Sequence, residues 1–222
     1  MEYSLNTLYF LVMGILVMWM ATGFTMLEAG SIRSKNVTEI LIKNVALYSV
    51  ASISFLLAGY GLMYGWAPPD DHALWSDFFF QVVFVATAMS VVSGAVAERK
   101  KLWTFLLFAT IFTGLIYPIQ GAWSWGGGWL SQRGFYDFAG SGIVHMAGAS
   151  AALAGVLLLG PRIGKYDENG LPKPIHGSNA AQVALGTLIL WMGWFGFNGG
   201  SQLAISGFEN ANAVAKIFVN TN

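Results

Sequence analysis

Long apolar stretches with almost no charged side chains leave this chain few possible folds. A helix that crosses a bilayer needs about 20 mostly apolar residues, and the chain has several windows of that length between its charged residues. They cover residues 7–30, 41–65, 78–97, 102–120, 138–160 and 180–200, and a further window begins near Ala211. We therefore predict about six spanning helices and the beginning of a seventh.

The low charge content supports the same environment. Hydrophobic residues make up 55% of the 222 residues and charged residues 10%, against roughly 25% charged in a soluble domain. The 11 basic and 11 acidic side chains cannot cover the surface of a soluble protein of this size. The composition therefore excludes a disordered chain, a nucleic-acid-binding protein and most soluble enzymes. Instead, it places the chain in a lipid bilayer.

The expected fold class is all-α, a polytopic membrane helix bundle with residues 1–222 as a single transmembrane domain. Short stretches at 41–65 and 180–200 could be strands, but the length of these windows favours helices. Outer-membrane barrels alternate apolar and polar residues over about ten positions, and no segment here does so. The 27 glycines indicate closely packed helices, because glycine lets membrane helices approach one another.

Basic residues are concentrated in alternate loops. Those after the first, third and fifth windows are Arg33 and Lys35, then Arg99, Lys100 and Lys101, then Arg162, Lys165 and Lys173. The opposite loops contain only Arg133 as a base. Because loops rich in lysine and arginine stay on the cytoplasmic side, we predict a multi-pass protein of the inner (plasma) membrane with its N-terminus outside. The N-terminus lacks a basic segment, so we expect the first helix to be retained.

Glu28 and Lys43 lie near the predicted inner ends of the first two helices, on either side of a basic loop. An ionisable group in a spanning helix costs about 2.5–3.5 kcal/mol on insertion scales, so each one requires a reason. One interpretation is interfacial, with snorkelling side chains or a short ion-pair cluster that fixes the helical hairpin. The alternative is an ion pathway.

Asp137 directly precedes the fifth window, and His145 lies within it. Counted from Asp137, His145 is roughly 12 Å deep at 1.5 Å per residue. It is either a neutral imidazole bonded to a neighbouring helix or a polar group that lines a path for a small polar solute. Asp137 fits an N-cap at the outer start of the helix, with a direct cation ligand as the alternative.

Four residues from separate stretches fall near one predicted depth with Asp137. They are Phe84, Trp125, Phe197 and Ser201. Aromatic faces attract cations by about 0.5–2 kcal/mol, and a hydroxyl can accept a hydrogen bond from an ammonium-type N–H. The group predicts either a cation-recruiting vestibule or an ordinary aromatic belt.

The sequence lacks the residue patterns of catalysis and cofactor binding. It has no Ser/His/Asp arrangement, no paired carboxylates at catalytic spacing and no lysine-containing phosphate loop after its glycine run. A zinc site is not expected, because His72 and His176 lie in opposite loops and the chain has no cysteine. We therefore expect no enzyme activity, no cofactor, no metal and no nucleic-acid partner.

Several motifs in order along the chain resemble those of the Amt/Mep/Rh superfamily of ammonium transporters, and its Amt branch in particular. The motifs are Ala21-Thr-Gly-Phe-Thr-Met-Leu-Glu-Ala-Gly30 with Arg33, Lys35, Asn36, Lys43 and Asn44; Phe80-Gln81, Phe84 and Gly94-Ala-Val-Ala-Glu-Arg99; Trp125-Gly-Gly-Gly128 and Asp137-Phe-Ala-Gly-Ser-Gly-Ile-Val-His145; and Gly193-Trp-Phe-Gly-Phe-Asn-Gly-Gly-Ser201. The resemblance covers essentially the whole chain.

The resemblance implies roles for particular residues. Trp125 and Ser201, with Phe84, match the external ammonium-binding site. Phe84 and Phe197 match the stacked phenyl pair that gates the pore below it. Asp137 matches the buried carboxylate that supports the site without direct contact. His145 matches the first of two pore-lining histidines that share a proton along the conduction path.

The resemblance also implies a mechanism and an assembly. Ammonium would be recruited at the outer aromatic site and deprotonated, and ammonia would cross an apolar pore while a proton relay operates. Members have roughly eleven helices in two inverted halves, form homotrimers and in many cases bind the PII signalling protein. This chain matches the first half plus about one helix, so we expect the second half of the fold and its second histidine to be absent.

Two alternatives follow from the same residues. The chain is an Amt-like sensor domain that binds ammonium without conducting it, or one part of a split transporter that needs a partner chain.

Overall fold

The computed structural model describes residues 1–222, and the chain is built from helices without β-strands. Six helical runs are long and apolar enough to cross a membrane. Their bounds are Glu2–Ser31 (α1), Ser34–Met63, Leu74–Ala95 (α4), Leu102–Ala122, Ser141–Leu159 and Ala180–Gly200 (α9). The prediction of an all-α membrane helix bundle is confirmed.

Three of the six runs are composite, which means that they combine α-helices with other helical turns. Two short helices complete the fold. The composite runs contain α2 (Val37–Ser54) with α3 (Tyr60–Met63), α5 (Leu102–Ile111) with α6 (Tyr117–Ala122), and α8 (Ala147–Leu159); the short helices are α7 (Trp129–Gln132) and α10 (Phe208–Thr221). Only the starts at residues 102 and 180 match the predicted windows. The other starts differ by a few residues: α1 begins at Glu2 instead of 7, α2 at Val37 instead of 41, α4 at Leu74 instead of 78, the fifth run at Ser141 instead of 138, and α10 at Phe208 instead of 211.

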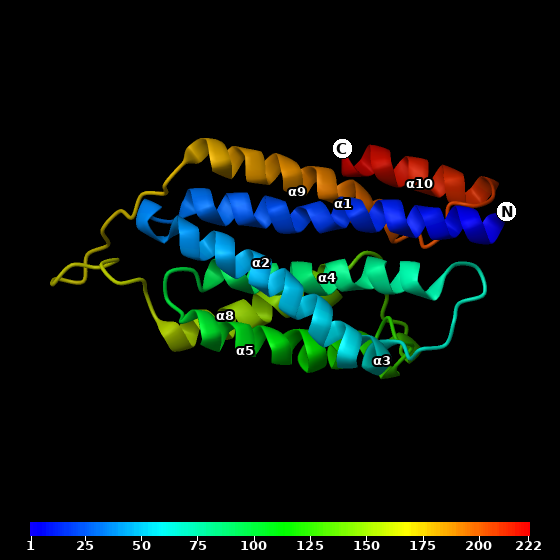
Figure 1. Ribbon diagram of the computed structural model, residues 1–222, viewed down its shortest axis with the longest axis horizontal. Helices are drawn as coiled ribbons and strands as arrows, with labels where there is room; N and C mark the ends of the chain where they lie inside the picture. The colour runs from blue at the N-terminus through cyan, green and yellow to red at the C-terminus, as the bar shows by residue number, and fades with distance from the viewer.

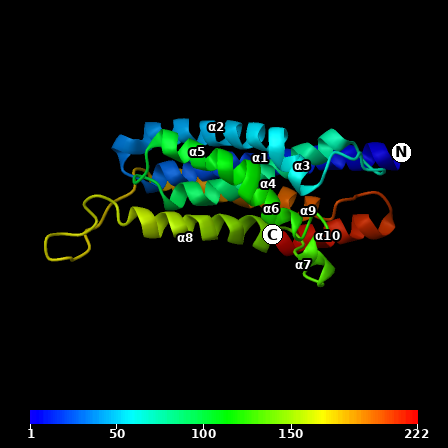
Figure 2. The same cartoon turned by 90° about the horizontal axis from the view of Figure 1, so that it is seen from below.

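The helices lie side by side, and their connections gather at the two ends of the bundle (Figures 1 and 2). One end has the N-terminus and residues 64–73, 123–140 and 201–207, and we call it the Trp125 end. The other has residues 32–36, 96–101 and 160–179, and we call it the Glu98 end. The loops that the sequence analysis grouped as basic all lie at the Glu98 end, and the loops with few basic residues lie at the Trp125 end.

Glycines let α1 and α9 pack against each other along their length (Figure 1). A Cβ atom at Gly186 would lie 2.5 Å from the backbone nitrogen of Leu27, and one at Gly196 would lie 2.5 Å from the carbonyl oxygen of Met13. Neither distance is possible for a real side chain, so any larger residue would force the helices apart. The close contact agrees with the expectation drawn from the glycine content.

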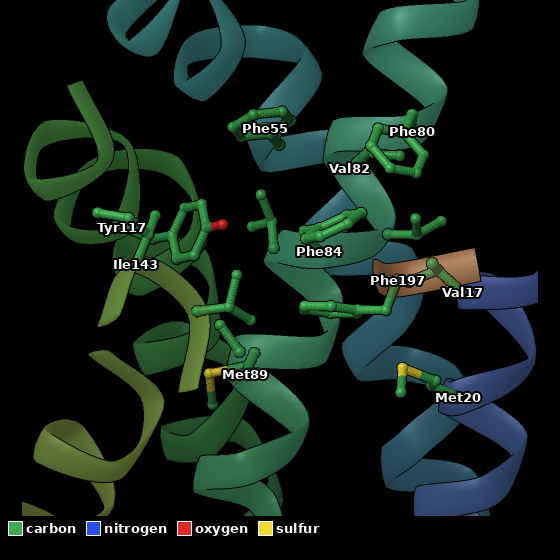
Figure 3. Close-up of a cluster of buried hydrophobic side chains, with 14 of the residues drawn as sticks. Val17, Met20, Phe55, Phe80, Val82, Phe84, Met89, Tyr117, Ile143 and Phe197 are labelled. Atoms are coloured by element: carbon green, nitrogen blue, oxygen red, sulfur yellow. The ribbon is translucent and has the colours of Figure 1, made fainter. Parts of the chain in front are cut away.

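Helix α4 forms the centre of the hydrophobic core. In its most apolar window 67% of the residues are buried, against 39% or less in the other spanning runs. Its side chains Phe80, Phe84 and Met89 are almost completely buried, and Figure 3 shows them between residues of the neighbouring helices. Residues on α4 are therefore shielded from lipid and can line an internal path.

Each composite run contains a π-helical turn, at Phe55–Gly59, Phe112–Ile116 and Ser141–Met146. The second of these precedes Pro118, whose ring crowds the carbonyl of the residue four positions earlier and which donates no hydrogen bond. The third turn contains His145, whose backbone N–H reaches back to the carbonyl of Gly140 at 2.9 Å. Such turns often occur at functional sites.

Glu28 and Lys43 form an ion pair inside the bundle. Lys43 Nζ lies 2.5 Å from Glu28 Oε2, and the side chains are 0% and 4% exposed, respectively. Ser93 of α4 accepts a hydrogen bond from Lys43 and donates one to Glu28 at 3.0 Å. The cluster therefore ties α1, α2 and α4 together. Of the interpretations left open, this geometry matches an ion-pair cluster that fixes the hairpin, and neither side chain snorkels.

Glu98 joins the three connections at its end of the bundle. Its fully buried carboxylate accepts hydrogen bonds from Arg33 Nε at 2.8 Å, from Asn36 Nδ2 at 2.5 Å and from Arg162 at 3.0 Å. Burial alone would raise the pKa of this carboxyl, but these hydrogen bonds outweigh burial and hold the pKa below its usual range. Glu98 is therefore ionised at neutral pH and holds these loops together.

Removing one partner of the buried pair tests its role. We expect Lys43→Met to destabilise the protein by about 3–5 kcal/mol, because it leaves the Glu28 carboxylate buried and unpaired. The double variant Lys43→Met/Glu28→Leu should recover much of this loss, since it removes the unpaired charge as well. Denaturant unfolding in detergent measures both. A double variant no more stable than Lys43→Met would contradict the assignment.

Candidate functional site: an aromatic pocket at the Trp125 end

A small pocket opens among aromatic side chains at the Trp125 end. Its volume is about 130 Å³, and its lining residues are Tyr64, Phe80, Gln81, Phe84, Trp125, Phe138, Ser201 and Leu203. Three residues singled out in the sequence, Phe84, Trp125 and Ser201, therefore lie together. The other three, Asp137, His145 and Phe197, do not line the pocket. Asp137 contacts Trp125, and Phe197 contacts both Phe84 and His145.

The Trp125 indole is held at the pocket by a turn that only glycine fits. A Cβ at Gly126 would lie 2.3 Å from the carbonyl oxygen of Met63, and one at Gly128 would lie 2.5 Å from that of Ala122. The indole N–H donates a hydrogen bond to the carbonyl oxygen of Asp137 at 2.7 Å. Its single donor is therefore occupied, so Trp125 presents only its π system to a ligand.

Ser201 presents acceptor lone pairs. Its Oγ donates a hydrogen bond to the carbonyl oxygen of Phe197 at 2.7 Å, one turn earlier on α9. With the hydroxyl hydrogen used there, the oxygen can accept hydrogen bonds from a ligand in the pocket. The chain then turns sharply, and Leu203 completes the wall with a positive φ of 65°.

A stacked phenyl pair lies beside the pocket. The ring centroids of Phe84 and Phe197 are 4.2 Å apart with an interplanar angle of 33°, and each residue is 1% exposed. Figure 3 shows the two rings one above the other, reaching from α4 and α9. Phe84 also meets Trp125 edge-on at 6.1 Å. Phe84 thus belongs both to the pocket wall and to the pair.

His145 lies on the far side of Phe197 from Phe84. Its ring centroid is 5.3 Å from that of Phe197 and 5.9 Å from that of Trp194, with which it is nearly parallel. The helical run that contains His145 begins at Ser141 rather than Asp137, so the helical rise before it is roughly 6 Å instead of 12 Å.

Asp137 caps the helical run that follows it. Its carboxylate oxygens accept hydrogen bonds from the backbone N–H groups of Gly140, Ser141, Gly142 and Ile143 at 2.8–3.1 Å. These bonds fit the capping role expected from the sequence, although the residue at the N-cap position itself is Gly140, with a φ of 105°. Through its side chain and its carbonyl, Asp137 fixes both the His145 helix and the Trp125 indole.

Sequence reasoning did not assign several residues of this site. Tyr64 and Gln81 share a hydrogen bond of 2.9 Å at the pocket wall, and Trp194 stacks on His145. Helical spacing offered a signal for two of them. Gln81 is three residues before Phe84, and Trp194 is three residues before Phe197, a spacing that places side chains on one helix face.

The fold defines this chain as a polytopic α-helical membrane protein with a small aromatic pocket near one end of the bundle. Residues 8–222 match the model of the Ammonium Transporter Family, and the chain belongs to that family.

Individual relatives support this assignment. The chain is 44% identical to "Ammonium transporter Amt2" of Archaeoglobus fulgidus, over 91% of this chain and 48% of that protein. It is 42% identical to "Putative ammonium transporter sll1017" of a Synechocystis species, over 99% of this chain and 54% of that protein. The chain thus spans about half the length of the curated relatives it matches.

Solved structures resemble the fold. A protein titled "Sensor Amt Protein" aligns with a TM-score of 0.92 and 34% identity, over 99% of this chain and 58% of that one. Mep2 of Candida albicans aligns with a TM-score of 0.79 and 27% identity, over 90% of this chain and 49% of that one.

Replacing Asp137 tests its capping role. We expect Asp137→Ala to destabilise the protein by about 2 kcal/mol, because buried N–H groups lose their acceptor. Asp137→Asn keeps one acceptor oxygen, so its stability should lie between those of the wild type and Asp137→Ala. Hydrogen exchange should accelerate at the amides of residues 140–143 in Asp137→Ala. Unchanged exchange at these amides would show that the carboxylate does not hold this helix.

Proposed function

We propose that this chain is the N-terminal part of an ammonium transporter. It recruits ammonium at the pocket formed by Trp125, Phe84 and Ser201, removes a proton, and conducts ammonia along an apolar path beside His145. The observation that carries the proposal is the aromatic pocket with a free hydroxyl acceptor, directly beside a buried phenyl pair, in a chain of the Ammonium Transporter Family.

The pocket has the chemistry to recognise a small cation. The rings of Trp125 and Phe84 attract positive charge by about 0.5–2 kcal/mol, more where water is excluded. Ser201 supplies an acceptor for an N–H of the ligand. A volume of about 130 Å³ suits an ion of this size with a few water molecules, since one water takes about 30 Å³ in the liquid.

The phenyl pair separates charged from neutral ligands. Phe84 and Phe197 leave no polar partner for an ion at their level, and an unpaired charge in such surroundings is strongly disfavoured. Neutral ammonia incurs little of this penalty. We propose that the pair gates the path, that Asp137 supports the site through the Trp125 indole and the His145 helix, and that His145 takes part in proton transfer.

The topology and assembly belong to the same proposal. Because basic loops stay on the cytoplasmic side, we propose that the Glu98 end lies in the cytoplasm and that the N-terminus and the pocket face outward from the plasma membrane. We propose that the remaining pore wall comes from the second half of the family fold, on the same polypeptide or on a partner chain. We propose a homotrimer that is open to regulation by a PII-type protein.

An ammonium sensor is the second candidate function. The similarity that favours it is the TM-score of 0.92 to a solved protein titled as a sensor. In this case the same pocket binds ammonium, but no ammonia crosses the membrane.

Ammonium-evoked currents from the complete polypeptide in liposomes test the proposal. We expect Trp125→Leu to raise the half-saturating ammonium concentration by about tenfold, because the cation loses its largest π face. The matched control is Trp103→Leu, since Trp103 is 80% exposed on α5, far from the pocket. It should behave as the wild type.

The outcomes separate the candidates. Currents that weaken only in Trp125→Leu support the transporter. Ammonium binding that is lost in Trp125→Leu, with no current from any variant, supports the sensor. Neither binding nor current from a folded wild-type protein would exclude both.

A further inference from the structure

A second cavity of about 400 Å³ adjoins the aromatic pocket. It shares Tyr64, Gln81 and Leu203 with that pocket and extends toward the connection between α3 and α4. Asp71, His72 and Asp77 also line it, and no lysine or arginine does. The cavity is therefore acidic and adjacent to the proposed ammonium site.

The connection that carries His72 is fixed to α1. The backbone N–H of Ala73 donates to Thr7 Oγ1 at 3.0 Å. The imidazole of His72 stacks on the ring of Phe10 with centroids 4.2 Å apart and an interplanar angle of 22°. Because His72 is only 9% exposed, its ring has one defined orientation at the cavity wall.

One ring nitrogen of His72 is unpaired. Nδ1 lies 2.7 Å from Asp71 Oδ1, and because an ionised carboxylate only accepts, Nδ1 must carry the hydrogen of this bond. In the neutral ring Nε2 is then an acceptor. It is buried and has no hydrogen-bond partner, which is unfavourable unless a ligand or water donates to it.

The carboxylate of Asp77 lies near the unpaired Nε2 of His72. Its carboxylate is held by Tyr60, whose hydroxyl donates to Oδ2 at 2.5 Å, and by Gln81, whose amide donates to Oδ1 at 3.3 Å. Oδ1 lies 4.0 Å from His72 Nε2. Two acceptors cannot bond to each other, but a donor with several N–H groups can lie within about 3 Å of both.

We propose that this cavity is a second, outer ammonium-binding site, where the cation donates hydrogen bonds to His72 Nε2 and Asp77 Oδ1 before it enters the Trp125 pocket. The inference rests on the proposed function of that pocket. Asp71 and Asp77 attract the cation, since a cleft lined by one sign of charge raises the local concentration of the opposite ion. Gln81 lines both cavities, so the two sites are neighbours.

Two isosteric substitutions of His72 isolate the unpaired nitrogen. In His72→Asn the amide replaces Nδ1 and the Nε2 acceptor is lost, whereas in His72→Gln the longer side chain can place an oxygen near the position of Nε2. We expect His72→Asn to raise the half-saturating concentration of ammonium chloride for current by about threefold or more, since a hydrogen bond from a charged donor is lost. His72→Gln should remain near the wild type, and so should the control His176→Asn, at an exposed loop residue.

A second pair of variants covers the case in which His72→Asn does not fold. Asp77→Asn removes the cavity carboxylate, and Asp70→Asn removes the same charge from an exposed position in the same connection. Only Asp77→Asn should weaken the ammonium dependence. An equal effect of both would mean that surface charge alone acts, and would overturn the inference.

The remaining outcomes distinguish this site from the proposed function. If Trp125→Leu weakens the response but His72→Asn and Asp77→Asn match the wild type, the cavity holds water only and this inference is wrong, while the Trp125 site stands. If the wild-type protein gives no response to ammonium, the proposed function itself fails.

Discussion

The free energy needed to remove a charge from water governs this structure. A bilayer offers no partner for an ion, so the spanning helices carry few ionisable groups and those within the bundle must be paired. Glu28 and Lys43 meet this requirement, at 2.5 Å from each other and together with Ser93. The pair connects three helices, α1, α2 and α4. The close approach of α1 to α9 depends instead on glycine.

The same constraint accounts for the proposed function. At the Trp125 end, a cation can exchange water for aromatic faces and a hydroxyl oxygen. Directly beside the pocket, the stacked rings of Phe84 and Phe197 are apolar and offer no such exchange. We propose that only a ligand able to lose its charge continues past them. Under this proposal, charge discrimination follows from the apolar rings of Phe84 and Phe197, which offer an ion no hydrogen-bonding partner.

The sequence predicted the fold class and the spanning segments, and it singled out Phe84, Trp125 and Ser201, which lie together at the pocket. Hydropathy and charge are enough for the segments, since each helix must satisfy the bilayer along its own length. Several details were not predicted. The π turn at His145 and the number of N–H groups bound by Asp137 depend on exact backbone geometry. The hydrogen bond between Tyr64 and Gln81 depends on how two separate segments meet. The sequence also does not reveal that the helical run with His145 starts at Ser141.

The most direct test of this account compares ammonium with potassium in liposomes that contain the complete polypeptide. Potassium resembles ammonium in charge and size but has no proton to lose. We predict a protein-dependent flux of ammonium nitrogen and no protein-dependent flux of potassium under the same gradient. Transport of both ions at comparable rates would contradict the account, because it would mean that a charged species passes the phenyl pair intact.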